Sequence, residues 1–213
     1  MTSLSTLARA ARLGAARKRG VTLIEAVLYI SIALALIVGG LVFFQQASLA
    51  QRTNSAVRNI SAIASETRGL YQQQNSFSGL TTGALINAGA VPTSLVTVSG
   101  TTSTLTNEWG GTITVEPNLA LTSPTLAAGA GFTVIYPSLP TAACVRLASV
   151  DASGTGRVGS GIRSIAFRAP GGSPGGSWGS EVLPGSLDPD DVSGSSLCGQ
   201  TGGVADVRFT FLR

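Results

Sequence analysis

The chain has 213 residues, of which 14 are Lys or Arg, 10 are Asp or Glu and none is His. Residues 1–20 contain five of the basic residues and no acidic residue, so the rest of the chain is close to neutral and gives no argument for nucleic-acid binding. The absence of histidine excludes a catalytic site built on a histidine base, and no stretch resembles a phosphate-binding loop. The composition therefore predicts neither an enzyme nor a cofactor.

The first predicted element is a long apolar helix that follows a basic segment. The basic residues end at Arg19, and a single acidic residue, Glu25, follows them. Residues 26–44 carry no charge, and as a helix they extend about 28 Å at 1.5 Å per residue. That length matches a hydrocarbon core of about 30 Å, so the segment can span a membrane.

Three interpretations of this segment compete. A removable secretory signal has a shorter apolar run with a small-residue cleavage site after it, whereas Gly20 precedes the run here. A plain anchor fits the length, and the basic residues would hold its N-terminus in the cytoplasm. An anchor gives no reason for Glu25, because ionisable groups at a membrane span are costly. The third interpretation is a signal cleaved between Gly20 and Val21.

The sequence GVTLIEAVLYISIALALIV, which begins at Gly20, resembles the N-terminus of type IV pilins. The resemblance implies that a prepilin peptidase removes residues 1–20 as a leader and that Val21 becomes an N-methylated terminus. The new amino group would be mostly cationic at neutral pH. In a filament core, the Glu25 carboxylate could pair with the Val21 amine of a neighbouring subunit and set its register. The alternative is that Glu25 lies at the headgroup boundary of an anchor.

Beyond Phe44 the helix is expected to become amphipathic and to continue to about Tyr71. An apolar stripe with helical spacing would then lie against a soluble domain. The stripe comprises Val57, Ile60, Ile63, Ala64, Thr67, Leu70 and Tyr71. We therefore expect three segments: a leader (1–20), an apolar transmembrane and filament-core half of the helix (21–51), and an exported domain (52–213).

The exported domain is predicted to hold an antiparallel sheet of three to five strands and one or two small helices, an α+β fold. A short helix should begin near Thr81 or Thr82 and stop at Gly89, and a Thr/Ser-rich loop should follow Val98. Alternation of apolar and polar residues predicts strands at 112–116, 131–136, 163–168 and 204–212. Residues 139–149 could form a strand or a short helix, and a helix is favoured. Residues 169–180 favour a loop, and residues 186–191 a helix start leading towards Cys198.

The two cysteines, Cys144 and Cys198, form an even pair, which in an exported protein predicts a disulfide. It would close a loop of about 55 residues and contribute about 4 kcal/mol. Zinc would need two further ligands and no histidine exists, so no metal is predicted there. Asp188, Asp190 and Asp191 could bind calcium, or two of them could serve a membrane-anchored hydrolase. No EF-hand spacing follows them, however, and three acids in a turn are usually solvated.

Four further stretches resemble the PilS group of type IVb pilins: Leu80–Pro92, the NEWGG turn with TITV after it, the GFTVIYPSLPTAACVRL block and the closing DVRFTF strand. The group implies the type IV pilin fold, in which a long N-terminal helix, half of it transmembrane, packs on an antiparallel sheet. It also implies that Cys144 and Cys198 close the variable C-terminal region.

The function that this resemblance implies is that of a structural prepilin. The subunit would be held in inner-membrane lipid, cleaved by prepilin peptidase, and polymerised with its own copies by the pilus assembly machinery. The product would be an extracellular pilus for adhesion or conjugation. A minor pilin or a type II secretion pseudopilin is the alternative.

Overall fold

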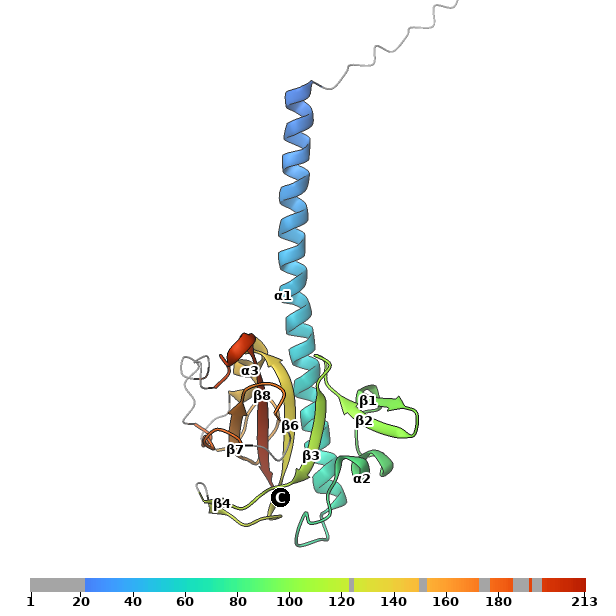
Figure 1. The fold of residues 1–213 in the computed structure, drawn as a ribbon, viewed down its shortest axis with the longest axis vertical. Coiled ribbons are helices and arrows are strands. Elements are labelled where there is room, and N and C mark those ends of the chain that lie inside the picture. The colour runs from blue at the N-terminus through green and yellow to red at the C-terminus, as the bar shows by residue number, and fades with distance from the viewer. Residues whose placement is uncertain (1–21, 123–124, 150–152, 173–176, 186–191, 193–196) are drawn as a thin grey trace, which may run out of the picture. The chain divides into compact units, whose positions relative to one another are not determined.

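The computed structural model describes residues 22–122, 125–149, 153–172, 177–185, 192 and 197–213. It divides the chain into two units, Met1–Gln45 and Gln46–Arg213, and each is described by itself. Helix α1 (Leu23–Leu70) belongs to both units, and all the strands belong to the second (Figure 1). The long helix predicted from Val21 to about Tyr71 is therefore present.

The second half of α1 packs against the sheet along one stripe. Its buried residues recur at intervals of three and four, as an amphipathic helix requires: Thr53, Ala56, Ile60, Ile63, Ala64 and Thr67. Leu70 was predicted to belong to this stripe, but it is the last helical residue and is 45% exposed. Tyr71 instead turns inward beyond the helix end, where its ring stacks on Phe77 at 5.2 Å between centroids.

Within the described residues the sheet has six antiparallel strands, so the expectation of three to five was wrong. Its spatial order is β1 (Val96–Ser99), β2 (Thr102–Thr106), β3 (Thr112–Pro117), β6 (Gly131–Pro140), β8 (Val204–Leu212) and β7 (Ile162–Arg168). The Thr/Ser-rich stretch expected to be a loop contains β2. Threonine is β-branched and favours strands, but it hides the apolar alternation by which strands are detected.

The small elements agree with the predictions in most respects. The N-cap of helix α2 (Thr82–Asn87) is Thr81, whose hydroxyl accepts a hydrogen bond from the backbone N–H of Ala84 at 3.1 Å. Helix α3 (Thr141–Ala148) occupies most of the segment that favoured a helix, while Pro140 still belongs to β6. The loop between β3 and β6 contains an unpredicted pair of short strands, β4 (Leu121–Thr122) and β5 (Thr125–Leu126).

Strand β8 organises the core because it pairs with both β6 and β7. Val207, Phe209 and Phe211 alternate towards the core, as predicted, and all three are fully buried. The ring of Phe211 stacks on Phe132 at 5.3 Å, and Phe132 lies 5.1 Å from Phe77. These rings fill the space between the end of α1 and the sheet.

Arg68 fastens the end of α1 to the end of the last strand. Its Nε donates a hydrogen bond to the carbonyl oxygen of Leu212 at 2.9 Å, and its Nη2 donates one to that of Ser160 at 2.7 Å. The guanidinium also lies over the Phe211 ring, 5.4 Å from its centroid. This arginine therefore joins three segments that are far apart in the sequence.

Candidate functional site

The start of α1 carries the acidic residue that the sequence singled out. The backbone N–H of Glu25 points to the Thr22 hydroxyl at 3.4 Å, and the N–H of Ala26 donates to the Thr22 carbonyl at 3.0 Å. Thr22 is thus an N-cap with a glutamate three residues later, the sequence pattern of a capping box. The spacing T-x-x-E was visible in the sequence and would have located the helix start.

The Glu25 side chain is exposed, and within the described residues its carboxylate has no hydrogen-bond or ion-pair partner. A negative charge in the first helical turn is favoured by the helix dipole, so this position suits an anion. The proposed cleavage site, Gly20 and Val21, lies outside the described residues. Among the described residues, the geometry therefore shows an exposed carboxylate in the first turn of the helix, and the Val21 amine expected to pair with it lies outside them.

The helix that follows Glu25 exposes apolar side chains on every side. Fifteen large apolar residues between Leu23 and Phe44 are at least half exposed, from Val42 and Ile32 at 50% to Leu23 at 84%. The segment is long and apolar enough to cross a membrane by length and composition. A helix that is apolar all round is stable only in lipid or in the interior of a larger assembly.

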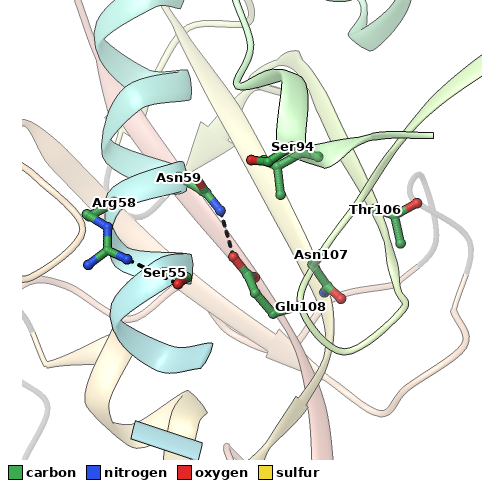
Figure 2. Close-up of a pocket in the computed structure, with 8 residues that line it drawn as sticks. Ser55, Arg58, Asn59, Ser94, Thr106, Asn107 and Glu108 are labelled. Atoms are coloured by element: carbon green, nitrogen blue, oxygen red, sulfur yellow. Dashed lines mark hydrogen bonds between the residues drawn. The ribbon is translucent and has the colours of Figure 1, made fainter. Parts of the chain in front are cut away.

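A polar cavity of about 420 Å³ lies between the second half of α1 and the turn before β3 (Figure 2). It is lined by Ser55, Arg58, Asn59, Ser94, Leu95, Thr106, Asn107 and Glu108. These residues offer hydroxyls, amides, one carboxylate and one guanidinium, which are hydrogen-bonding groups. Sequence reasoning assigned the turn correctly but gave no role to the residues that line the cavity.

Glu108 is the central residue of this cavity. One carboxylate oxygen accepts a hydrogen bond from Asn59 Nδ2 at 2.6 Å, and the other accepts one from the Tyr136 hydroxyl at 2.6 Å (Figure 2 shows the first). Burial raises the pKa of Tyr136, and the hydrogen bond to Glu108 raises it further, so the phenol stays neutral and donates. Glu108 therefore connects α1, the turn and β6.

The turn that holds Glu108 explains the NEWGG motif. The Asn107 side-chain oxygen accepts from the backbone N–H groups of Trp109 at 2.9 Å and Gly111 at 2.8 Å. Its amide donates to the Pro137 carbonyl at 2.6 Å. Gly110 has a φ of 83°, which favours glycine, and a Cβ at Gly111 would lie 2.7 Å from Pro137 Cγ.

The disulfide between Cys144 and Cys198, predicted from the cysteine count, is present, with 5.7 Å between the two Cα atoms. It ties α3 to the segment before β8, and both cysteines are fully buried. The carbonyl of Cys198 also accepts a hydrogen bond from the Thr141 hydroxyl at 3.1 Å. Cys198 lies in a turn, and the predicted helix start at 186–191 is outside the described residues, as are Asp188, Asp190 and Asp191.

On the sheet face opposite α1, the structure places charged pairs that sequence reasoning missed. Arg168 pairs with Asp206 at 3.2 Å, and Arg208 pairs with Glu181. Both guanidinium groups lie over the Trp178 ring, at 4.1 and 4.8 Å from its centroid. The signal was the alternation in β8, which puts Asp206 and Arg208 on the face opposite the core residues.

Glu116 of β3 lies near the same charged groups. Burial raises the pKa of this carboxyl, and Arg208 and Arg168 oppose the rise. Among the described residues there is no group of three or more His, Cys, Asp or Glu side chains that could hold a metal ion. On this face of the sheet, the charges of Arg168 and Arg208 are therefore offset by the carboxylates of Asp206 and Glu181.

Comparison with known proteins gives two consistent findings. The model of the PilS family, described as the PilS N-terminal region, matches residues 50–166. The major structural subunit of bundle-forming pilus from Escherichia coli O127:H6 is 30% identical over 148 residues, which cover 68% of this chain and 70% of that protein. The protein of the same description from Escherichia coli O111:H- matches to the same extent. The family match begins in the second half of α1 and ends in β7.

Proposed function

Because the chain belongs to the PilS family of type IVb pilins, we propose that it is the structural subunit of a type IVb pilus and polymerises with its own copies. The observation that carries this proposal is the uncharged helix of residues 26–44, whose large side chains are exposed on every side. Glu25 lies directly before it and has no hydrogen-bond or ion-pair partner among the described residues. Such a helix needs a cover, and a bundle of identical helices provides one. The resulting filament is extracellular.

The same helix lies in two different environments in succession, first the membrane and then the filament. Before assembly, inner-membrane lipid covers it, since burying one Leu, Ile, Val or Phe side chain contributes about 1.5–3 kcal/mol. In the filament, neighbouring copies replace the lipid. Lipid tails are as apolar as these side chains, so the exchange gives little hydrophobic gain. Another interaction must therefore favour the filament and fix its register.

Glu25 supplies that interaction in our proposal. Prepilin peptidase cleaves after Gly20, and the new Val21 amino group, which keeps its positive charge when methylated, pairs with Glu25 of an adjacent copy. The support is chemical: Glu25 is the single acid between residue 1 and Glu66, and its carboxylate is exposed at the helix start. Leaving either charge buried alone in the filament would cost about 3–5 kcal/mol per subunit.

Filament yield of a Glu25→Ala variant tests the proposal. The variant should be made, cleaved and held in the membrane as well as the parent chain, but it should give few or no sheared pili. Glu25→Gln should behave like Glu25→Ala, because the amide keeps the shape and loses the charge. Glu25→Asp is the matched control, because it keeps the charge and shortens the side chain, and it should retain part of the yield. Normal pili from Glu25→Ala would overturn the role of Glu25.

Mass spectrometry of the assembled protein tests the processing step. Loss of residues 1–20 and one added methyl group on Val21 are the expected results. Gly20→Leu should leave the leader in place, because the larger side chain crowds the peptidase site. The fraction of this chain in sheared pili also separates a major from a minor pilin, and we expect it to be the main component. An intact N-terminus in assembled pili would contradict cleavage.

A further inference from the structure

A second cavity, of about 420 Å³, lies on the sheet face opposite α1. It is lined by residues of β3, β6, β7 and β8, together with glycines of the turn before β3 and of the loop after β7. Thr114 is paired with Ile135 across β3 and β6, so the two share one face of the sheet. Arg168 and Asp206 are paired in the same way across β7 and β8. The volume is within the range of small-molecule sites, about 300–1,000 Å³.

The walls of this cavity are held in place by close contacts. A Cβ at Gly111 would lie 2.7 Å from Pro137 Cγ, and one at Gly172 would lie 2.8 Å from the guanidinium carbon of Arg168. Glycine therefore allows both backbones to approach their neighbours closely. The Asn107 amide donates to the Pro137 carbonyl at 2.6 Å, and Arg168 Nη2 donates to the Gly172 carbonyl. A cavity whose walls are fixed in advance loses little conformational freedom when it binds a ligand.

A β-bulge with a strained residue forms one side of the cavity. The register of β6 with β8 shifts between Tyr136 and Leu139. Pro137 and Ser138 therefore lie together opposite the single residue Asp206, which is the pattern of a bulge. Ser138 has a φ of 58° and, among the described residues, is the one non-glycine residue with a positive φ. Such strain is concentrated at functional sites and is retained there by the surrounding structure.

The lining combines a balanced ion pair with hydroxyl groups. Arg168 and Asp206, the charged residues among the described lining, pair at 3.2 Å, and their side chains are 8% and 1% exposed. Their charges offset each other, so the cavity suits a neutral ligand. Asp206 Oδ1 accepts one hydrogen bond in the described structure, from the backbone N–H of Ser138, and a carboxylate oxygen can accept two. Thr112 and Thr114 add hydroxyls, which both donate and accept.

We propose that this cavity binds a neutral sugar residue of an uncharged polysaccharide. Sugar hydroxyls donate and accept, as the lining does, and the C–H groups of a sugar ring suit the apolar side chains of Ile135 and Pro137. A charged sugar would leave its charge unpaired, because Arg168 and Asp206 already pair with each other. An extended peptide is disfavoured, because β3, β6 and β8 are each paired on both sides and offer no free strand edge.

The test uses the full-length subunit in a detergent without a sugar headgroup, because the site lies within one subunit. The probe is an array of immobilised neutral oligosaccharides of glucose, galactose, mannose and N-acetylglucosamine, beside sialylated and sulfated ones. The parent should bind a neutral oligosaccharide, and a variant with both Thr112→Val and Thr114→Val should bind it at least tenfold more weakly. Valine keeps the β-branched shape and removes the hydroxyl. Thr102→Val with Thr104→Val in β2 is the matched control and should bind like the parent.

Ser138→Gly separates a binding role of the bulge from a structural one. Glycine adopts the positive φ without strain and keeps the N–H that Asp206 accepts, so the variant should be at least as stable as the parent. Its affinity for the sugar should nevertheless fall about threefold, because the bulge is less rigid. Absence of neutral-sugar binding by the parent, preference for charged sugars, or unchanged affinity of either variant would overturn the proposal. The Glu25 experiment tests pilus assembly independently of these outcomes.

Discussion

On one side of the sheet, β1 and β2 form a hairpin with a two-residue turn, and no charge occurs from Gly69 to Asn107. On the other side, β7 and β8 lie among a disulfide, two arginine–carboxylate pairs and a tryptophan between two arginines. The first region depends on contacts between neighbours in sequence. The second depends on contacts across 38 to 144 residues, such as those of Arg168 and Arg68.

The difference follows from what each stretch of sequence can bury. Between α3 and β8 the chain is rich in glycine and serine, which bring little apolar surface to a core and lose much freedom when they are ordered. Covalent and ionic cross-links offset that deficit. The β1–β2 region is ordered by β-branched threonine and valine, so it needs no cross-link and keeps its edge uncharged. The following predictions test this contrast.

The largest expected effect on stability is that of the disulfide. Cys144→Ser should lower the free energy of unfolding by about 4 kcal/mol on the loop-entropy model. The measurement is denaturant unfolding of the full-length protein in detergent, followed by tryptophan fluorescence. Reduction of the parent protein is the control and should give a similar loss. If both thiols react with an alkylating agent in the folded, unreduced protein, the predicted stabilisation is wrong.

The next effect concerns Asp206, which is 1% exposed. Its carboxylate accepts from the backbone N–H of Ser138 at 2.9 Å and from Arg168 Nε at 3.2 Å. Asp206→Asn should destabilise the fold by about 3 kcal/mol, because a buried arginine loses its counter-charge. Glu66→Gln, an exposed acid on α1, is the control and should change stability by less than about 0.5 kcal/mol. Equal effects of the two changes would contradict the role assigned to the pair.

These two cases also show what the sequence could predict. Helix α1, strands β3, β6, β7 and β8, and the cysteine pair followed from local periodicity and composition. The pairing of Arg168 with Asp206 did not, because nothing in a local pattern specifies which of several arginines and acids meet across 38 residues. β2 was missed for a different reason: threonine gives a strand the right backbone preference without an apolar alternation.

The residues of the candidate functional site were also predicted only in part, because only some of them give a local signal in the sequence. Glu25 stood out because a single acid beside an uncharged run is a local signal. Glu108 did not, because its importance arises from Asn59 and Tyr136, which lie 49 and 28 residues away. Sequence reasoning thus singled out the residue that we propose acts between subunits and missed the one that joins elements within the subunit.

Tyr136→Phe tests the hydrogen bond by which β6 is joined to Glu108 in the turn before β3. Loss of the hydrogen bond to Glu108 should cost about 2 kcal/mol at neutral pH, because the acceptor is charged. The raised pKa of Tyr136 in the folded state has a second consequence. Its stabilising contribution is complete below the unfolded pKa of about 10 and falls as the pH rises above that value, because the unfolded phenol ionises first.

Unfolding measured from pH 8 to 11 checks this sign. The parent protein should lose stability above about pH 10, and Tyr136→Phe should lose less over the same range. Tyr71→Phe is the control, because Tyr71 also packs in an aromatic contact and is only partly buried. An identical alkaline slope in the parent and Tyr136→Phe would contradict the contribution of this phenol.

The smallest effect should be confined to the β1–β2 hairpin. Gly100 has a φ of 61° and open space where a Cβ would lie, so a side chain there meets backbone strain and no clash. Gly100→Val should therefore make local opening of the hairpin easier by about 1 kcal/mol, because β-branched residues avoid this conformation. Gly100→Asn should cost less, because asparagine tolerates this backbone conformation.

Hydrogen exchange of the β1 and β2 amides is the measurement, with β6 and β8 amides as the internal reference. If the hairpin depends on local contacts, its amides should already exchange faster in the parent, and Gly100→Val should accelerate those amides alone. Equal acceleration in β6 and β8 would show that the two sides of the sheet unfold as one unit, and the contrast between them would then lie in charge and not in stability.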